Sequence, residues 1–346
     1  MKIFVTGGSG FIGSHLIEGL AGAGYDVTAL IRKAGNAGFL PPDKAILRVG
    51  DLKNYESLKK AMNGCDVVFH VAALCTDWAT EKDFYEVNVV GTRNVLRAAK
   101  ENNIGKIILI SSTGVLGEED CPSPKNEDAP YRPEMSYFLS KWVESGMNHY
   151  RRTKMLAERE SIEFCRKNNI DLTVIRPAWV YGPREFHAGP FEFCNAISKG
   201  YRIMPMGRQN RFHVIFVRDL VEAMISAMEK NVPGINVFNI GNSSVPLMRD
   251  YFNLFCEHMK VKRPVYVPFF LIYPFAIILE VLAKCLGSRR PFLLTRARVK
   301  MFYCNNIYDV SKTQKVLGFV PTTSLEDGVK ETVDWWIGNG YLQERR

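Results

Sequence analysis

Among the tyrosines that are followed, four residues later, by a lysine are Tyr137, with Lys141, and Tyr150, with Lys154. Residues spaced by four lie on the same face of an α-helix. A free phenol has a pKa of about 10, and a neighbouring ammonium group lowers that pKa because it stabilises the phenolate. Such a pair can therefore act as a general acid or base near neutral pH, as the reduction of a carbonyl by a nicotinamide requires.

The two pairs compete for one role, and the surrounding sequence favours Tyr150 and Lys154. Lys154 is followed by an amphipathic segment that stops shortly before the apolar run Leu172–Ile175, which predicts one crossover helix between two strands. A helix that began at Tyr137 would need about 30 residues and would contain Gly146, whereas typical helices have 8–20 residues.

A hydroxyl donor is expected where another apolar run ends, in Ile110-Ser111-Ser112-Thr113-Gly114-Val115. At the carboxyl end of a strand, a hydroxyl can hydrogen-bond the substrate oxygen. We predict Ser112 for this role, although Ser111 and Thr113 are alternatives, and such a serine can also serve only to turn the chain. The separation from Ser112 is compatible with Tyr137 as well.

A glycine-rich turn begins the chain. The run Ile3–Thr6 continues into Gly7-Gly8-Ser9-Gly10-Phe11-Ile12-Gly13 and then into a predicted amphipathic helix from Ser14. The glycines let the backbone turn tightly and approach a pyrophosphate, and the helix N-terminus offers unpaired N–H groups. This strand–turn–helix context predicts a dinucleotide site formed by Gly7, Gly10, Phe11, Ile12 and Gly13.

The end of the second predicted strand indicates which dinucleotide is bound. An acidic residue there would bind the ribose hydroxyls of NAD, and a basic one would bind the 2′-phosphate of NADP. The strand ends in Arg32 and Lys33, whereas the nearest acid, Asp26, precedes the strand. Arg32 can bind a phosphate through two N–H groups. NADP(H) is therefore favoured, with NAD(H) as the alternative.

Strand and helix patterns alternate through the first half of the chain, which predicts a doubly wound parallel sheet with helices on both faces, an α/β fold. After Pro177 the alternation gives way to loops and mixed helices. We expect residues 1–176 to form the nucleotide-binding domain, with a return segment near 210–242, and residues 177–346 to form mainly a small substrate-binding lobe. The predicted strands are Ile3–Thr6, Val27–Ile31, Ala45–Val49, Asp66–Val71, Lys106–Ser111 and Leu172–Ile175, and predicted helices include Phe84–Ala99 and Met155–Arg166.

These motifs together resemble the extended short-chain dehydrogenase/reductase family, within the NAD-dependent epimerase/dehydratase superfamily. The spacing G-x-x-G-x-x-G is similar to that family's TGxxGxxG motif, and the pattern from Tyr150 to Glu158 is similar to the Y-x-x-(S/T)-K-x-x-A-E of its dihydroflavonol reductase and 3β-hydroxysteroid dehydrogenase branches. The resemblance covers most of the chain. Further matching motifs are Gly50-Asp51-Leu52, Phe69-His70-Val71-Ala72-Ala73, Asn88-Val89-Val90-Gly91-Thr92, Arg176-Pro177 and Val180-Tyr181-Gly182-Pro183.

The resemblance implies a Rossmann-type domain, a homodimer and further cofactor contacts. It implies that Tyr150 is the acid/base, that Lys154 lowers its pKa and holds the nicotinamide ribose, and that Ser112 orients the substrate oxygen. Asn88 is expected either to order a proton relay or to be structural, and His70 is expected to be a core histidine. The remaining expected cofactor contacts are Asp51, Leu52, Ala72, Ala73, Asn88, Tyr150 and Pro177.

Composition excludes several function classes. The net charge is +9, yet there is no dense Lys/Arg tract, so we expect no nucleic-acid partner. The eight cysteines have no C-x-x-C spacing and are interpreted as reduced, mostly buried thiols, and the histidines lack metal-ligand spacing, so no metal is predicted. The first apolar run, Ile3–Val5, is too short for a secretory signal, so we expect a cytoplasmic protein.

The most hydrophobic stretch, Val265–Leu279, is interrupted by Pro268 and Pro274 and has 15 uncharged residues, fewer than a spanning helix needs. Two interpretations remain open. The stretch is either a buried helix that lines an apolar substrate pocket, which is the default, or a peripheral membrane contact within 265–298. Basic side chains that could meet anionic lipid are Arg289, Arg290, Arg296 and Arg298.

The sequence thus predicts an NAD(P)-dependent oxidoreductase that interconverts a hydroxyl and a ketone. The aromatic and aliphatic lobe favours a hydrophobic substrate that is steroid-, isoprenoid-, flavonoid- or 3-oxoacyl-like. Two other functions stay open: a nucleotide-sugar epimerase or dehydratase with tightly bound NAD, and a non-catalytic module that senses a dinucleotide.

Overall fold

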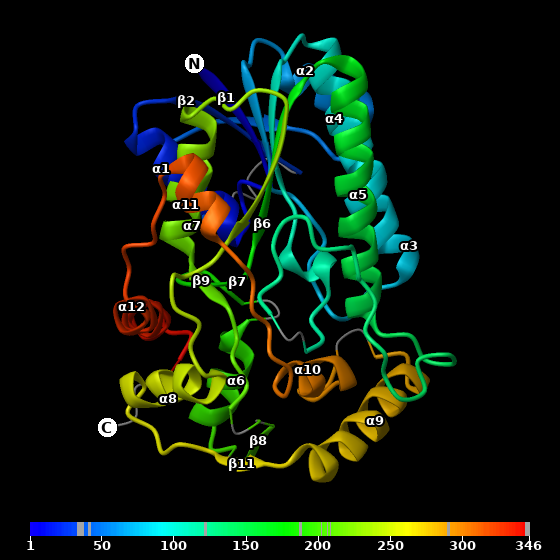
Figure 1. Cartoon of the computed structure of the whole chain (residues 1–346), viewed down its shortest axis with the longest axis vertical. Helices are drawn as coiled ribbons and strands as arrows, with labels where there is room; N and C mark the ends of the chain where they lie inside the picture. The colour runs from blue at the N-terminus through cyan, green and yellow to red at the C-terminus, as the bar shows by residue number, and fades with distance from the viewer. Residues whose placement is uncertain are drawn as a thin grey trace.

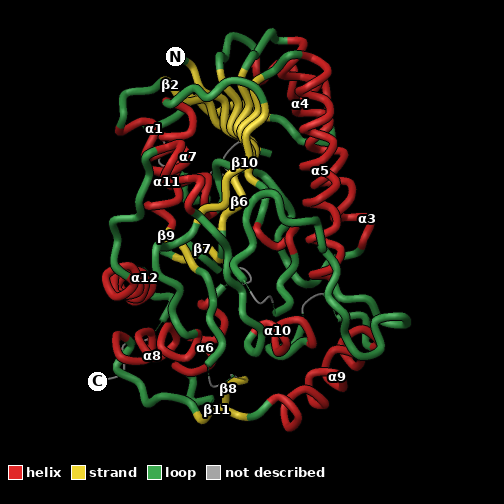
Figure 2. The backbone as a smooth tube through the Cα atoms, in the orientation of Figure 1, coloured by secondary structure: helices red, strands yellow, loops and turns green. Residues whose placement is uncertain are grey.

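A computed structural model describes residues 1–32, 38–40, 43–120, 123–186, 189–201, 203–205, 207, 209–288 and 291–342. Figures 1 and 2 show a large sheet with flanking helices at one end of the molecule and a smaller lobe at the other end. The chain begins in the sheet, and it ends beside the smaller lobe.

Seven parallel strands form the sheet, in the order β10-β6-β5-β4-β1-β2-β3. This confirms the predicted α/β fold class, and β10 adds a strand to the six predicted from sequence. Because parallel strands end at a common edge, the segments after β1, β4 and β5 come together there. The strands are β1 (Lys2–Thr6), β2 (Asp26–Ile31), β3 (Ile46–Val49), β4 (Val67–His70), β5 (Lys106–Ile110), β6 (Asp171–Pro177) and β10 (Ile235–Ile240).

Helices cover both faces of the sheet (Figure 1), as strands that are apolar on both sides require. One face packs against α1 (Phe11–Gly22), α7 (Val217–Glu229) and α11 (Ser311–Leu317), and the other packs against α2 (Tyr55–Met62), α4 (Gly91–Glu101) and α5 (Gly146–Asn168). Helix α1 starts at Phe11 rather than at the predicted Ser14, so three residues of the glycine turn belong to its first turn.

The smaller lobe has an aromatic core that joins α6 (Pro190–Ser198), α8 (Met248–His258) and α12 (Leu325–Gly338). Two short parallel pairs complete it: β7 (Trp179–Tyr181) with β9 (Val214–Phe216), and β8 (Ile203–Pro205) with β11 (Val265–Val267). Its largest buried aromatic side chains include Phe252, Phe255, Tyr251 and Trp336.

The lobe is fastened to α1 directly beside the glycine turn. The His15 ring nitrogen Nε2 lies 3.0 Å from the carbonyl of Pro183, and the Arg184 guanidinium donates to Ser14 Oγ at 3.1 Å and to Glu18 at 2.6 Å. The lobe therefore holds the helix whose N-terminus is expected to meet the phosphates.

The apolar segment forms helix α9 (Phe269–Cys285), followed by α10 (Arg296–Met301). The default expectation of a buried helix is wrong for its outer face, where Phe270 and Phe275 are 72% and 63% exposed. Pro274 lies inside α9 and does not end it. None of the helices in the described parts of the chain is long and apolar enough to span a bilayer.

Candidate active site

The glycine turn after β1 has a shape that only glycines allow. Gly7 has φ +75°, and a Cβ on it would lie 2.7 Å from the amide nitrogen of Ala72. A Cβ on Gly13 would lie 2.1 Å from the Gly7 carbonyl oxygen. In the first turn of α1, the N–H groups of Phe11, Ile12 and Gly13 have no preceding helical carbonyl to bond. This cradle fits the pyrophosphate of a dinucleotide.

Tyr150 and Lys154 lie on one face of α5, and Ser112 directly follows β5. The Tyr150 hydroxyl is hydrogen-bonded with Ser112 and with the thiol of Cys75. Ser112 Oγ accepts from the Gly114 N–H at 3.0 Å, which turns the chain after the strand. The Lys154 ammonium is buried and donates to the Ile110 carbonyl, at the end of the same strand. The predicted catalytic set therefore meets at the carboxyl edge of the sheet.

The two neighbours of Ser112 point elsewhere. Ser111 Oγ donates to the Glu158 carboxylate at 2.5 Å, and Thr113 Oγ1 donates to the Pro177 carbonyl at 3.2 Å. Both side chains are buried, and Ser112 is the one that reaches Tyr150. Because consecutive side chains point in different directions here, only Ser112 of the three hydroxyls faces Tyr150.

Tyr137 and Lys141 do not share a helix. They belong to a loop of turns in which Leu139 has a φ of +63°, and α5 begins only at Gly146. The Tyr137 hydroxyl accepts from Arg151 at 3.2 Å, so it is engaged in the core of the loop. Lys141 is exposed to solvent.

The packing at the start of α5 explains this boundary. A Cβ on Gly146 would lie 2.4 Å from the Asp77 carbonyl oxygen, so only glycine lets the helix start against the segment that follows β4. That segment carries Cys75. The contact sets the distance between Cys75 and Tyr150 one helical turn further on.

Burial shifts the ionisation of both catalytic groups. It raises the pKa of Tyr150 well above its usual value of 10, with the neighbouring Cys75 adding to the rise and the hydrogen bond from Ser112 opposing it. Burial lowers the pKa of Lys154 to about 8, against the charges of Cys75 and Glu158. The expectation that Lys154 lowers the Tyr150 pKa is therefore not met in the protein chain by itself, because desolvation outweighs every neighbouring charge.

Cys75 is the site residue that sequence reasoning missed. The cysteines were expected to be mostly buried, but Cys75 and Cys285 are exposed. Cys75 is open to solvent, although protein atoms surround it closely enough to raise its thiol pKa. Its thiol lies against the Tyr150 hydroxyl, which places Cys75 in the candidate site. Its position five residues after His70, beyond the end of β4, was the available signal.

Asn88 acts through the backbone around the site. It lies in a π-helical turn, η1 (Tyr85–Val90), which continues α3 (Glu81–Phe84). Its side chain accepts from the Leu74 N–H at 2.7 Å and donates to the Leu74 carbonyl and to Thr153 Oγ1. It therefore joins the segment after β4 to α5 next to Lys154, and it positions both.

His70 is a core histidine, as the sequence indicated. Its two ring nitrogens lie 2.8 Å from Thr6 Oγ1 and 2.9 Å from Thr92 Oγ1, and burial lowers its pKa to about 3. It stays neutral at physiological pH. This fixed ring ties β4 to β1 and α4.

The remaining expected cofactor contacts lie along the same edge. Arg32 is exposed just after β2, whereas Asp26 is the first residue of that strand, at its opposite end. Lys33 is outside the described residues. Asp51 is exposed after β3 and accepts from the Lys53 N–H at 2.9 Å. Leu52 lies after β3, Ala72 and Ala73 lie after β4, and Pro177 is the last residue of β6.

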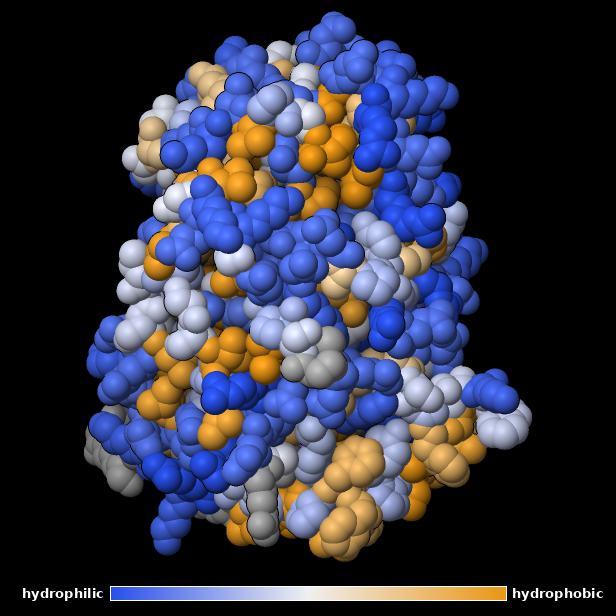
Figure 3. All heavy atoms as spheres, viewed as in Figure 1, coloured by the Kyte–Doolittle hydropathy of each residue, from blue (hydrophilic) through white to orange (hydrophobic). Residues whose placement is uncertain are grey.

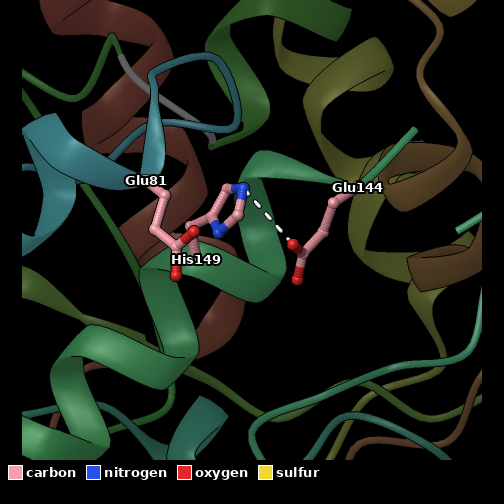
Figure 4. A group of neighbouring side chains, drawn as sticks. All are labelled: Glu81, Glu144 and His149. Atoms are coloured by element: carbon pink, nitrogen blue, oxygen red, sulfur yellow. Dashed lines mark ion pairs between the residues drawn. The ribbon is translucent and has the colours of Figure 1, made fainter. Parts of the chain in front are cut away.

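A separate group of ligating side chains lies behind the site: Glu81, Glu144 and His149 (Figure 4). His149 Nε2 lies 3.8 Å from Glu144. Both carboxylates also receive hydrogen bonds from the Arg152 guanidinium, at 3.1 Å to Glu81 and 2.6 Å to Glu144. Because a cation of the protein already holds these carboxylates, we interpret the group as an ion-pair network.

Comparisons with known proteins agree with this geometry. The model of the NAD dependent epimerase/dehydratase family matches residues 3–241. The 2-alkyl-3-oxoalkanoate reductase of Shewanella oneidensis is 27% identical over 351 residues, which cover 94% of this chain and 84% of that relative. The decarboxylating sterol-4-alpha-carboxylate 3-dehydrogenase of Mus musculus is 29% identical over 343 residues, which cover 96% and 90%.

Among solved structures, a UDP-glucose 4-epimerase from Thermotoga maritima with UDP-glucose superposes with a TM-score of 0.76 at 26% identity. The match covers 98% of this chain and 99% of that one. With the glycine cradle and the Ser112, Tyr150 and Lys154 arrangement, these matches give the assignment. The chain belongs to the NAD dependent epimerase/dehydratase family, the extended short-chain dehydrogenases/reductases, and is a dehydrogenase/reductase enzyme.

Proposed function

We propose that this enzyme interconverts a ketone and a hydroxyl group on a hydrophobic substrate, with NADP(H) as the preferred cofactor. The observation that carries the proposal is the meeting of Ser112, Tyr150 and Lys154 at the carboxyl end of β5. The glycine cradle after β1 lies on the same edge of the sheet.

In this proposal Tyr150 exchanges a proton with the substrate oxygen, and Ser112 holds that oxygen through its hydroxyl. The dinucleotide supplies or accepts the hydride. Burial keeps the Tyr150 pKa well above 10, so the phenol is protonated at neutral pH and is ready to donate. Lys154 has a pKa lowered to about 8 and lies one turn away on α5, where it can return a proton to the phenol.

The names of the relatives support a substrate with an oxygen at carbon 3 and a large apolar body. One relative is a 2-alkyl-3-oxoalkanoate reductase, and another is a sterol-4-alpha-carboxylate 3-dehydrogenase. Both names describe a carboxylate on the carbon adjacent to the one that carries the reacting oxygen. We therefore propose 3-oxo or 3-hydroxy compounds with an alkyl or sterol skeleton as the first substrates to assay.

Arg32 supports NADP(H). Its side chain is exposed at the end of β2. Arg32 directly follows the strand, whereas the acidic Asp26 lies at the opposite end of it. A guanidinium there suits a 2′-phosphate. NAD(H) remains the cofactor to compare in every assay.

The test is oxidation of NADPH and of NADH, followed by absorbance, against apolar 3-ketones that include a 2-alkyl-3-oxoalkanoate and a sterol 3-ketone. We expect turnover with at least one of them and a loss of about 10²–10⁴ in kcat for Tyr150→Phe, the range for a removed acid/base. Tyr137→Phe is the matched control and should keep its turnover within a few-fold. Full turnover by Tyr150→Phe would overturn the proposal.

A nucleotide-sugar epimerase is the second candidate, and one observation favours it. A surface pocket of about 460 Å³ is lined by Gln209, Arg211, Leu247 and Arg249, and two guanidinium groups suit a diphosphate. This candidate predicts that the purified enzyme retains NAD and binds a UDP-sugar without net redox turnover.

A further inference from the structure

The outer face of α9 is apolar along its whole length. Five side chains spaced by three or four residues form one stripe along the helix and its C-cap. Within Phe269–Cys285, Lys284 is the single charged residue that is exposed. The stripe consists of Leu271, Phe275, Ile278, Leu282 and Leu286, which are 51%, 63%, 55%, 48% and 75% exposed.

The inner face of the same helix carries a charged pair. Glu280 is 3% exposed and accepts from the Arg296 guanidinium at 2.8 and 3.0 Å, and Arg296 is 0% exposed. A surface helix ordinarily turns its apolar stripe inward and its charges outward. Helix α9 buries the apolar Ile272, Ala276 and Ala283 on its inner side together with Glu280, and it leaves the five-residue apolar stripe outside. The core of this protein therefore does not explain the stripe.

Neighbouring segments extend the apolar surface at both ends of α9. The loop that carries Phe138 and Trp142 (63% and 79% exposed) is bonded to the helix, because the Phe138 N–H donates to the Tyr273 hydroxyl at 3.2 Å. At the other end, Ile203 and Val265 of the β8–β11 pair are 64% and 65% exposed. Figure 3 shows hydrophobic side chains gathered along this lower edge, where Figure 1 places α9 and β11. We call this surface the α9 face.

The stretch of sequence that carries α9 is mainly basic. Residues 260–300 contain nine lysines and arginines and one acid, Glu280. Arg296 and Arg298, expected to meet lipid, are instead buried against Glu280 and Asp77, and Arg289 and Arg290 lie outside the described residues. Exposed lysines at both ends of the face remain, among them Lys141 and Lys199.

We infer that the α9 face docks onto an anionic lipid surface. A helix that lies in the plane of a membrane interface buries an apolar side and places basic groups among the headgroups. An exposed tryptophan such as Trp142 is typical of that depth. A second copy of this chain would bring the same lysines together and add repulsion. Charge complementarity therefore favours lipid.

Docking would hold the active site close to the membrane. Trp78 Nε1 donates to the Ser288 carbonyl at 2.8 Å just after α9, and Arg298 of α10 donates to Asp77 at 2.6 Å. Asp77 and Trp78 belong to the segment that carries Cys75. The inference about lipid stands without the proposed function, although a membrane-dissolved substrate would fit both.

The experiment is co-sedimentation of the full chain with vesicles of phosphatidylcholine alone or mixed with phosphatidylglycerol. We expect binding to the mixed vesicles that weakens at high salt. The variant Leu271→Ser/Phe275→Ser/Leu282→Ser should bind at least about tenfold more weakly. The matched control Ile46→Ser/Val49→Ser changes residues that are 62% and 56% exposed on β3, far from α9 in sequence and at the sheet edge, and should bind like wild type.

Two further measurements identify the occupant. Lys141→Glu/Lys199→Glu should weaken binding to the mixed vesicles. The emission of Trp142, obtained as the difference between the fluorescence spectra of wild type and Trp142→Phe, should shift to shorter wavelength when the mixed vesicles are added. Equal sedimentation of the triple-serine variant and wild type, or no sedimentation of either, would overturn the inference. So would a dimer in solution that the triple-serine variant abolishes, because the occupant would then be a second copy. Tyr150→Phe should bind vesicles normally, which separates this inference from the proposed function.

Discussion

Arg176 and Glu158 form an ion pair whose side chains are 3% and 0% exposed. Glu158 lies one turn after Lys154 on α5, and Arg176 lies near the end of β6. The same carboxylate accepts from Ser111 Oγ at 2.5 Å, at the end of β5. The pair therefore holds α5 against β5 and β6, and it fixes the distance between Tyr150 and Ser112.

We predict that Glu158→Ala destabilises the fold by about 3–5 kcal/mol, because it leaves a buried guanidinium without its partner. The matched control is Glu160→Ala on the same helix. Glu160 pairs with Arg93 at the surface, where side chains are 32% and 46% exposed, and an exposed pair contributes about 0–1 kcal/mol. Urea unfolding of both variants measures the difference. Equal losses would contradict the role given to the buried pair.

We predict that Ser112→Ala lowers kcat about 10²-fold, the cost of removing one donor to a reacting oxygen. Ser111→Ala removes a hydroxyl of the same kind one residue away, where it bonds Glu158 rather than Tyr150. That variant should lower stability and leave kcat within a few-fold. Steady-state kinetics of both variants, beside their melting temperatures, tests the assignment, and a reversed pattern would move the catalytic role to Ser111.

Local patterns in the sequence were sufficient for six of the seven strands of the sheet, and they favoured Tyr150 over Tyr137. The strands are short runs with few competing signals, and Gly146 marks the start of α5 because helix length and glycine both argued against a start at Tyr137. The alternation of Ser111, Ser112 and Thr113 could not be read from composition alone, since all three hydroxyls are chemically equivalent until the strand fixes their directions.

Contacts between distant segments were beyond the sequence. Arg298 looked like a lipid-facing cation, but its partner Asp77 stands 221 residues earlier in the chain. Cys75 approaches Tyr150 only because the segment after β4 packs against Gly146. The apolar run of α9 predicted a buried helix. That its apolar stripe faces outward became visible only in the structure, where Glu280 lies on the inner side.

Arg32 leads to a prediction about cofactor choice. Arg32→Ala should raise the KM for NADPH about tenfold or more, because a charge-assisted contact to a phosphate contributes at least that factor. The KM for NADH should change little. The NADH measurement on the same variant is the control for a general effect on the fold. An equal change for both would mean that Arg32 acts on the fold around β2 instead of on the 2′-phosphate.

Lys154 leads to a prediction about pH. Its pKa is about 8 in the folded protein, below the usual lysine value, because burial disfavours its charge. Between pH 8 and about 10.5 the unfolded chain therefore binds the extra proton, so this group makes stability rise with pH in that window. Lys154→Met should be more stable than wild type at pH 7, by about 3 kcal/mol at most, and the advantage should shrink by pH 10.

The difference between variant and wild type, measured by urea unfolding at both pH values, cancels the thiols and phenols that also titrate there. Lys167→Met changes an exposed lysine of the same helix and should show no such dependence on pH. If Lys154→Met kept the same advantage at both pH values, Lys154 would not be a desolvated ammonium, and its place in the proton transfer would be lost.

The glycine turn offers the sharpest test of the cofactor site, because two of the three glycines in α1 have opposite surroundings. A Cβ on Gly13 would lie 2.1 Å from the Gly7 carbonyl oxygen, whereas a Cβ on Gly22 would meet nothing within 4 Å. Gly22→Ala should therefore keep the affinity for NADPH and stabilise the fold by up to about 1 kcal/mol. Gly13→Ala must push the first turn of α1 away from β1 and should weaken NADPH binding at least about tenfold. NADPH titrations followed by fluorescence, with the far-ultraviolet circular dichroism of each variant, measure both effects, and unchanged affinity in Gly13→Ala would mean that the dinucleotide does not rest on this turn.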